Sequence, residues 1–281
     1  MGAHTSMKAG GPAAAFYEPE DEAGLVSLVS GFHEAGRLFF LLGNGTNVIV
    51  RDSGYPGAVV STLKALSGYI TEPSRGKLVA GAGEPLARVC RASAEAGLSG
   101  LEALSGIPGT VGGAVYMNAG AYGGEIADVI VSVRAYDMGD CKTIMLTREE
   151  CAFGYRDSVF RKSPWIILSA EFSLAASEKQ EIEAAMAGFT RKRNEKQPVE
   201  LPSAGSFFKR PEGDYAGRLI EAAGMKGARV GGAQVSLKHA GFIVNTGGAT
   251  VGDVLALASL VKEKVFEMSG IMLEEEPVIL G

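Results

Sequence analysis

Hydrophobic residues recur along the chain with two spacings, one typical of helices and the other of strands. Apolar residues three and four positions apart predict amphipathic helices, expected at residues 20–35, 84–96, 178–193, 215–223 and 251–269. Short apolar or alternating runs predict strands, expected at residues 13–17, 38–42, 48–50, 58–62, 78–80, 129–136, 143–146, 165–174, 231–236, 241–245 and 271–280. Strands and helices alternate unevenly, with many adjacent strands, which favours an α+β fold over a regular doubly wound sheet.

Two local patterns sharpen these expectations. The run at residues 38–42 is continuously apolar, as expected of a strand buried on both faces. Thr147 and Glu150 have the spacing of a capping box and predict a short helix. The composition becomes more polar near residue 175. We therefore expect two domains, residues 1–174 and residues 175–281.

The longest stretch without either spacing is residues 97–125, which is rich in glycine. Nine glycines fall between Gly97 and Gly124, yet its leucine, isoleucine and valine content predicts order. Ordered loops of this length are usually functional. Glycine lets backbone amides approach a ligand, and successive amides form concave anion sites. Two interpretations stay open: a cradle for a phosphate-bearing cofactor, or a structural crossover. Inside it, residues 107–110 (Ile-Pro-Gly-Thr) predict a tight turn.

A second glycine loop, Gly43-Asn44-Gly45-Thr46-Asn47, lies between two predicted strands. It lacks the lysine and hydroxyl ending of a P-loop, and the element that follows is a strand instead of the helix of a dinucleotide fingerprint. The Asn-Gly pair favours a hairpin turn. Two glycines and two amide side chains are equally suited to wrapping a pyrophosphate.

Composition and charge narrow the class of protein. The net charge is −5 with no basic block, which argues against a nucleic-acid partner. No apolar run reaches the roughly 18 residues of a membrane span, so we expect no membrane association. The three cysteines and three histidines are scattered. This pattern predicts reduced thiols in a cytoplasmic protein and no metal site.

Three places carry side chains capable of chemistry: Tyr155-Arg156 in a predicted loop, Ser206 next to two phenylalanines, and Glu274, Glu275 and Glu276 near the C-terminus. Each has an ordinary explanation as well, namely a surface ion pair, a turn and a solvated end. The residues alone leave these alternatives open.

A set of motifs in one order resembles the UDP-N-acetylenolpyruvoylglucosamine reductase (MurB) family. These motifs span nearly the whole chain, and as an ordered set they are specific. They are Gly10-Gly-Pro-Ala13, Gly43-Asn-Gly-Thr-Asn47, Ser105 to Glu125, Tyr155-Arg-Asp-Ser158, Ala204-Gly-Ser-Phe-Phe-Lys-Arg-Pro211, Ala216 to Gly224, Gly232-Ala-Gln-Val-Ser236, Lys238-His-Ala-Gly-Phe242 and Leu273-Glu-Glu-Glu276.

The resemblance implies an α+β fold: a two-lobed FAD-binding domain of the vanillyl-alcohol-oxidase (PCMH) type, and a C-terminal α+β substrate-binding domain that closes over the substrate. It implies reduction of the enolpyruvyl ether of a UDP-sugar by hydride from FAD, which NADPH reduces. By resemblance, FAD contacts come from Gly10, Gly11, Pro12, Gly43, Asn44, Gly45, Thr46, Asn47, Ser105, Gly106, Ile107, Pro108, Gly109, Thr110, Gly112, Gly113, Asn118, Gly120 and Ala121.

The resemblance also assigns catalytic roles. Arg156 faces the carboxylate on which negative charge develops, Glu276 supports the resulting enediolate, and Ser206 donates the final proton. Lys209 or another nearby cation is expected to assist the serine, which alone is a poor acid. Glu274 is the alternative to Glu276, because Pro277 and Val278 replace the usual Val-Arg after it. Substrate contacts are expected from Tyr122, Tyr155, Lys209, Gln234 and His239.

The chain resembles the shorter MurB subtype, without the substrate-capping tyrosine loop, and we expect a monomer or weak oligomer. Two rival functions stay open. A flavin oxidase would use oxygen as the acceptor; such enzymes often tether FAD through His or Cys, which the glycine loops lack. A non-catalytic flavin- or nucleotide-binding protein would not need Arg156, Ser206 and Glu276 together.

Overall fold

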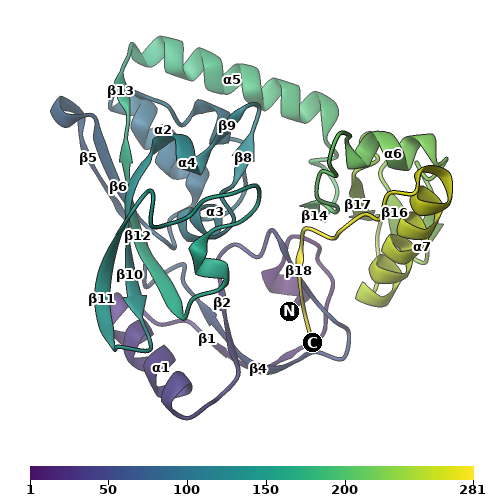
Figure 1. Ribbon diagram of the computed structural model, residues 1–281, viewed down its shortest axis with the longest axis horizontal. Helices are drawn as coiled ribbons and strands as arrows, with labels where there is room; N and C mark the ends of the chain where they lie inside the picture. Colours follow the sequence, from purple (N-terminus) through teal and green to yellow (C-terminus); the bar gives the residue numbers. More distant parts are fainter. The chain divides into compact units, whose positions relative to one another are not determined.

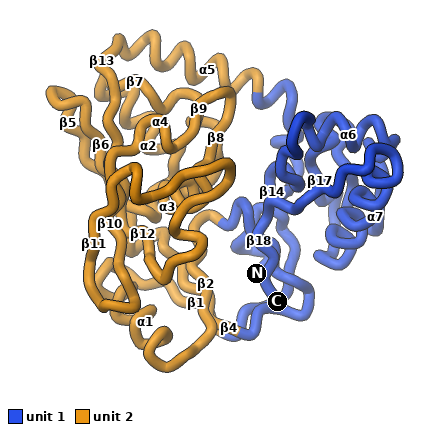
Figure 2. The backbone as a smooth tube through the Cα atoms, in the orientation of Figure 1, with its two compact units in different colours: residues 1–14, 45–56, 193–281 blue, residues 15–44, 57–192 orange.

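The structure, a computed structural model, describes residues 1–281 and divides them into two compact units (Figure 2). Unit 1 consists of Met1–Ala14, Gly45–Pro56 and Arg193–Gly281, and unit 2 of Ala15–Asn44 and Gly57–Lys192. The boundary expected after residue 174 does not separate these units, because two N-terminal segments belong with the C-terminal residues. None of the helices combines the length and the hydrophobicity that a membrane-spanning helix needs.

Unit 2 is built around an antiparallel sheet (Figure 1). Its order is β11 (Lys142–Thr147), β10 (Ile130–Asp137), β12 (Trp165–Ser173), β6 (Lys77–Gly81) and β5 (Tyr69–Glu72). The helices of this part of the chain are α1 (Glu22–Glu34), α2 (Leu86–Glu95), α3 (Val111–Tyr116), α4 (Ile126–Val129) and most of α5 (Lys179–Lys196). Antiparallel pairing of strands without crossover helices fits the α+β class.

Smaller strand pairs complete the sheets. A further sheet has the order β1 (Ala13–Tyr17), β4 (Tyr55–Ser61) and β2 (Phe39–Leu42), in which β2 and β4 are parallel. Two-stranded pairs form between β7 (Leu98–Ser99) and β13 (Ala175–Ala176), and between β8 (Gly120–Ala121) and β9 (Gly124–Glu125). Single 3-10 turns occur at Gly2–His4, Pro73–Arg75, Glu102–Leu104 and Val159–Arg161.

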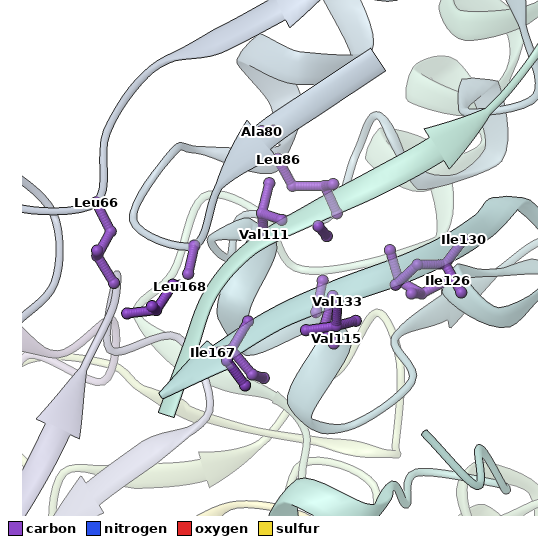
Figure 3. Packing of buried hydrophobic residues seen from close by; sticks show 14 of the residues in the cluster. Leu66, Ala80, Leu86, Val111, Val115, Ile126, Ile130, Val133, Ile167 and Leu168 are labelled. Carbon is purple, nitrogen blue, oxygen red and sulfur yellow. The ribbon is translucent and has the colours of Figure 1, made fainter. Parts of the chain in front are cut away.

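The core of unit 2 anchors the glycine-rich stretch. Val111 and Val115 of α3 are fully buried, in the same cluster as Val133 of β10 and Leu168 of β12 (Figure 3). Fully burying one such side chain contributes about 1.5–3 kcal/mol. The apolar positions of residues 97–125 therefore fasten this stretch to the sheet, while its glycines remain near the surface.

Unit 1 joins both ends of the chain. Its sheet has the order β14 (Ser203–Ser206), β17 (Phe242–Asn245), β16 (Ala233–Val235) and β15 (Arg229–Val230), and its helices are α6 (Ala216–Ala222) and α7 (Val251–Ser269). The last strand, β18 (Val278–Leu280), runs parallel to β3 (Val48–Val50). The carboxylate of Asp52 accepts from the amides of Val251 (3.0 Å) and Gly252 (2.7 Å) at the start of α7.

Most predicted elements are confirmed within a few residues, including β1, α1, α5, α6 and α7. Helix α7 lies between the two residues that predicted its ends, since Thr250 caps it and Gly270 closes it in a left-handed conformation (φ 70°). The short helix predicted at Thr147 is wrong. The capping-box bonds to Glu150 form at 2.8 and 3.3 Å, but they close only a turn.

Three further expectations are wrong. The loop after β2 is not a hairpin turn, because β2 pairs with β4 and β3 with β18. Strand β2 lies at the edge of its sheet, so Leu38 just before it is 57% exposed. Gly109 and Thr110 lie against Pro85 and Leu86 instead of forming a tight turn: Leu86 N donates to Gly109 O at 3.0 Å. The glycine content of the stretch also concealed α3, a helix that the sequence did not predict.

Candidate active site

Two glycine loops of unit 2 that the sequence singled out contact each other. The amide side chain of Asn44, at the carboxyl end of β2, donates to the carbonyl of Pro108 at 2.8 Å. A Cβ on Gly43 would lie 2.5 Å from the Thr110 hydroxyl, so only glycine allows this approach. Residues 43–44 and 108–110 are therefore brought together.

This pair of loops presents unpaired backbone donors. The amides of Gly43, Asn44, Gly106 and Gly109 donate to no other group of the protein. Amides left without a protein partner need water or a ligand, and several of them from neighbouring loops suit an anion. Gly43 and Asn44 also follow the carboxyl end of a parallel strand, where ligands commonly bind in open sheets. These residues fit the diphosphate of a dinucleotide such as FAD.

The cofactor candidates next to these amides in the sequence are held by hydrogen bonds within the protein. Thr110 accepts from Gly113 N at 3.3 Å and caps α3, and Gly112 N donates to Ala82 O at 2.8 Å. The Ser105 hydroxyl donates to Glu102 O at 2.7 Å, and Ile107 N to Leu104 O at 3.0 Å. These residues fix the backbone beside the free amides.

The predicted contact between Asn118 and FAD has to be corrected. Its side chain has no exposed surface, so it has no face to offer to a cofactor. Its amide is used inside the protein, donating to Gly154 O at 3.1 Å and accepting from Ala127 N at 3.0 Å. We therefore no longer expect Asn118 to contact FAD.

The remaining cofactor candidates lie in unit 1 or in the β8 hairpin. Gly11 N donates to Arg51 O at 3.0 Å, and Pro12 O accepts from Tyr55 N at 2.8 Å. A Cβ on Gly10 would lie 2.6 Å from Val50 O, and one on Gly45 2.1 Å from His4 O. Close backbone packing thus explains these glycines without a ligand. Thr46 and Asn47 continue the same loop, while Gly120 and Ala121 pair with β9.

Arg156 occupies a strained turn in unit 2. Gly154 and Asp157 exchange both backbone hydrogen bonds, at 3.0 and 3.2 Å, across Tyr155 and Arg156. Arg156 has a φ of 54°, a region that favours glycine. Its guanidinium donates to Gly120 O at 3.1 Å and lies over the ring of Tyr155, 5.2 Å from the centroid. Strain of this kind clusters at functional sites.

The resemblance predicted two tyrosines of unit 2 as substrate contacts, Tyr155, which lies in this turn, and Tyr122. Tyr155 is 52% exposed and Tyr122 is 39% exposed, each large for an aromatic side chain. Tyr122 has a φ of 54° and stacks on Phe189 of α5, with ring centroids 5.3 Å apart. Phe189 was not predicted as its partner, since helical spacing alone does not show what a residue contacts.

Ser206 and Glu276 are neighbours in unit 1. The C-terminal segment pairs with the residues after β14: Glu276 N donates to Phe207 O at 2.9 Å, and Lys209 N to Glu274 O at 2.8 Å. The side-chain amide of Asn47 (Nδ2) donates to Glu276 O at 3.4 Å. Residues separated by about a quarter of the chain are thereby fixed beside each other, and both Ser206 and Glu276 are partly exposed.

The three consecutive glutamates have different surroundings. Glu274 is 72% exposed and pairs with Lys209, Nζ to Oε2 3.0 Å. Glu275 pairs with Lys262 at 2.9 Å. The backbones of all three glutamates pair with residues 207–209, and Glu276 is the one bonded to Phe207, the residue directly after Ser206. This arrangement favours Glu276 over Glu274 as the carboxylate that acts with Ser206.

Gln234 and His239, also in unit 1, have partners inside the protein. Gln234 of β16 donates to Gly227 O at 3.1 Å and accepts from Arg229 at 3.3 Å. Nδ1 of His239 accepts from Gly241 N at 3.1 Å, so in the neutral ring the proton is on Nε2. Burial lowers the pKa of His239, which favours this neutral form.

Comparisons with known proteins agree with this arrangement. Residues 13–147 match the family model described as "FAD binding domain", and residues 197–280 match "UDP-N-acetylenolpyruvoylglucosamine reductase, C-terminal domain". Proteins named UDP-N-acetylenolpyruvoylglucosamine reductase are similar over the full chain. The one from Caldanaerobacter subterraneus is 44% identical over 100% of this chain and 92% of its own length. That from Pseudothermotoga lettingae is 45% identical over 97% and 93%.

A solved structure agrees as well. The crystal structure of MurB from Thermus caldophilus has a TM-score of 0.84 and 37% sequence identity, covering 100% of this chain and 97% of the other. The resemblance carried by the motifs is thus confirmed over both compact units. The chain belongs to the UDP-N-acetylenolpyruvoylglucosamine reductase (MurB) family.

Proposed function

We propose that the protein reduces the enolpyruvyl ether of UDP-N-acetylglucosamine enolpyruvate to the lactyl ether of UDP-N-acetylmuramate, with FAD and NADPH, for peptidoglycan synthesis. Family membership supports the reaction. The observation that carries it is the pairing that fixes Glu276 beside Ser206, with Glu276 N donating to Phe207 O at 2.9 Å. A non-catalytic nucleotide-binding protein would have no need of this pair.

FAD would be held by the free amides of the two glycine loops, those of Gly43, Asn44, Gly106 and Gly109, with Asn44 and Pro108 joining the loops. When bound, and after reduction by NADPH, it supplies a hydride to the outer carbon of the substrate's double bond. Side chains of the protein are proposed to stabilise the negative charge that results and to deliver the proton that completes the reaction.

Arg156 is proposed to face the substrate carboxylate. Hydride addition at the outer carbon leaves an enediolate, whose negative charge lies on the carboxylate oxygens. A guanidinium offers paired donors that remain charged at every relevant pH. Because the turn fixes Arg156 at a φ of 54°, these donors need little reorganisation when the charge develops.

Glu276 is proposed to hold a proton and to donate it in a hydrogen bond to the enediolate. Ser206 is proposed to deliver a proton to the inner carbon. A serine hydroxyl is a poor acid and requires a polar partner or a chain of water molecules. Lys209 is the cation nearest in sequence, and its ion pair with Glu274 keeps it beside this strand.

Substrate contacts are proposed for Tyr122, Tyr155, Lys209, Gln234 and His239. The exposed rings of Tyr122 and Tyr155 support this role, and Nε2–H of His239 is available as a donor. Gln234 would have to give up a present partner. Location in the cytoplasm and a monomeric or weakly associated state belong to the proposal; the three cysteines are free thiols, which fits a reducing compartment.

Visible absorbance tests the proposal directly. The purified protein, loaded with FAD, is mixed anaerobically with NADPH and then with the enolpyruvyl UDP-sugar. We expect the yellow colour to bleach with NADPH and to return with the UDP-sugar. Colour that returns only with oxygen would point to an oxidase. Protein that cannot be loaded with FAD would contradict the assignment of the glycine loops.

A further inference from the structure

Three hydrogen bonds join two segments of unit 2 around Arg156. The Ser158 hydroxyl donates to Tyr116 O at 2.6 Å, the Asn118 amide to Gly154 O at 3.1 Å, and the Arg156 guanidinium to Gly120 O at 3.1 Å. Residues 116–120 thus hold residues 154–158 at both ends and in the middle. Asn118 and Ser158 are 0% and 2% exposed, so water does not compete for their bonds.

Asn118 is the residue of this set whose side chain makes two hydrogen bonds inside the protein. Its amide side chain bridges the Arg156 turn to α4, donating to Gly154 O and accepting from Ala127 N at 3.0 Å. Its own φ is 44°, a conformation that glycine adopts freely and asparagine tolerates best among other residues. Glycine would satisfy the backbone but would lack the amide. Asparagine supplies the amide and tolerates this backbone conformation better than most other residues.

The turn needs such support, because its own geometry is unfavourable. Arg156 is in the left-handed region, and strained residues persist only where the surrounding structure fixes them. The Gly154 carbonyl, which accepts from Asn118, is the start of the turn that Arg156 occupies. A shift of Gly154 moves the guanidinium, and misplacement of a substrate-orienting group by about 1 Å can cost 10²-fold in rate.

We propose that Asn118 is a positioning residue, which fixes the Gly154 carbonyl and so orients the Arg156 guanidinium toward the substrate carboxylate. It contacts neither cofactor nor substrate. This inference rests on the proposed function, because it takes the role of Arg156 from there. It predicts that loss of the Asn118 amide slows reduction of the enolpyruvyl substrate and leaves cofactor binding unchanged.

The test is a double-mutant cycle of Asn118→Gly and Arg156→Lys, since lysine keeps the charge but cannot offer paired donors. Three quantities are measured: the rate at which the enolpyruvyl UDP-sugar reoxidises the reduced enzyme, the rate of reduction by NADPH, and the Kd of FAD for the apoprotein. We expect Asn118→Gly to slow substrate reduction about tenfold in the native background and less than about twofold in the Arg156→Lys background.

The NADPH rate and the FAD Kd are expected to stay unchanged. Equal effects of Asn118→Gly in both backgrounds, or a parallel change in FAD affinity, would overturn the positioning role. Should Asn118→Gly not fold, Ser158→Ala removes a single bond of the same set and must show the same dependence on Arg156. Native enzyme that fails to reduce the UDP-sugar would instead refute the proposed function, which separates the two failures.

Discussion

The backbone amide of Glu276 donates a 2.9 Å hydrogen bond to the carbonyl of Phe207, next to Ser206. Two candidate groups from distant parts of the sequence are thereby fixed in one place by main-chain atoms. Because main-chain atoms make this pairing, we expect it to survive substitution of either side chain, so that variants at these positions report on chemistry.

Glu276→Gln is expected to slow the reduction of the enolpyruvyl substrate by about 10²-fold or more, because the amide cannot share a proton with the enediolate. The matched control is Glu274→Gln, which loses an exposed ion pair with Lys209 worth about 1 kcal/mol at most. Single-turnover rates with prereduced enzyme distinguish the two. A larger loss in Glu274→Gln would make Glu274 the acting carboxylate.

Ser206→Ala is expected to slow proton delivery to the inner carbon while the NADPH step continues. The rate of bleaching by NADPH should match the native enzyme, and the return of colour with substrate should slow by about 10²–10⁴-fold. Ser203→Ala, at the other end of β14, serves as the control and should behave as the native enzyme does. If both steps slow equally in Ser206→Ala, the serine acts on binding or structure instead.

Gly43→Ala tests the cofactor site by a steric effect, because it adds a methyl group and changes no polar group. A Cβ there would lie 2.5 Å from the Thr110 hydroxyl, so the two loops that present the free amides must separate. We expect the Kd of FAD to rise at least about tenfold, which corresponds to a loss of about 1.4 kcal/mol of binding free energy. The control is Gly188→Ala in α5, where a Cβ meets nothing within 4 Å. FAD titration of the apoproteins by fluorescence measures both, and equal affinities would contradict this assignment.

What the sequence predicted well is local. Thr250 and Gly270 mark the ends of α7, because a capping hydroxyl and a left-handed glycine act within one turn of the helix. What it missed depends on distant partners. The pairing of β3 with β18 joins residue 48 to residue 278, and no periodicity encodes such a partner. Helix α3 was missed because Gly112 and Gly113 are poor helix formers, and burial of Val111 and Val115 outweighs that propensity.

The candidate site divides in the same way. The motifs identified Arg156, Ser206 and Glu276 as candidate catalytic residues, but only the structure shows which neighbouring residues hold them. The internal bonds of Asn118 could not be read from its motif, because burial depends on the packing of residues 116–120 against residues 154–158. A motif records that a residue matters without recording whether it contacts a ligand.

The left-handed turn predicts an unusual order of stabilities at residue 156. Arg156→Gly and Arg156→Ala both remove the guanidinium and its bond to Gly120 O, and both should lose substrate reduction. Glycine relieves the strain at φ 54°, whereas alanine keeps it. We expect Arg156→Gly to exceed Arg156→Ala by about 1 kcal/mol in the free energy of unfolding. Urea unfolding measures the difference, and equal stabilities would mean that the turn is not strained in solution.

His239 predicts the direction of a pH effect on stability. Burial lowers the pKa of His239, so as the pH falls the unfolded chain takes up the proton first, near the ordinary pKa of about 6.5. Stability is therefore complete above that pH and decreases as the pH falls toward the lower pKa of the folded state. Protonation at Nδ1 also removes the acceptor for Gly241 N, and Gly241 O accepts from Phe207 N beside Ser206.

The test is the variant His239→Asn, which keeps an acceptor but does not titrate. Between pH 7.5 and pH 5 its free energy of unfolding should fall less than that of the native protein, because the part of the fall that comes from His239 is absent. His33→Asn, at an exposed position, should keep the native pH dependence; the same dependence in His239→Asn would show that another group is responsible.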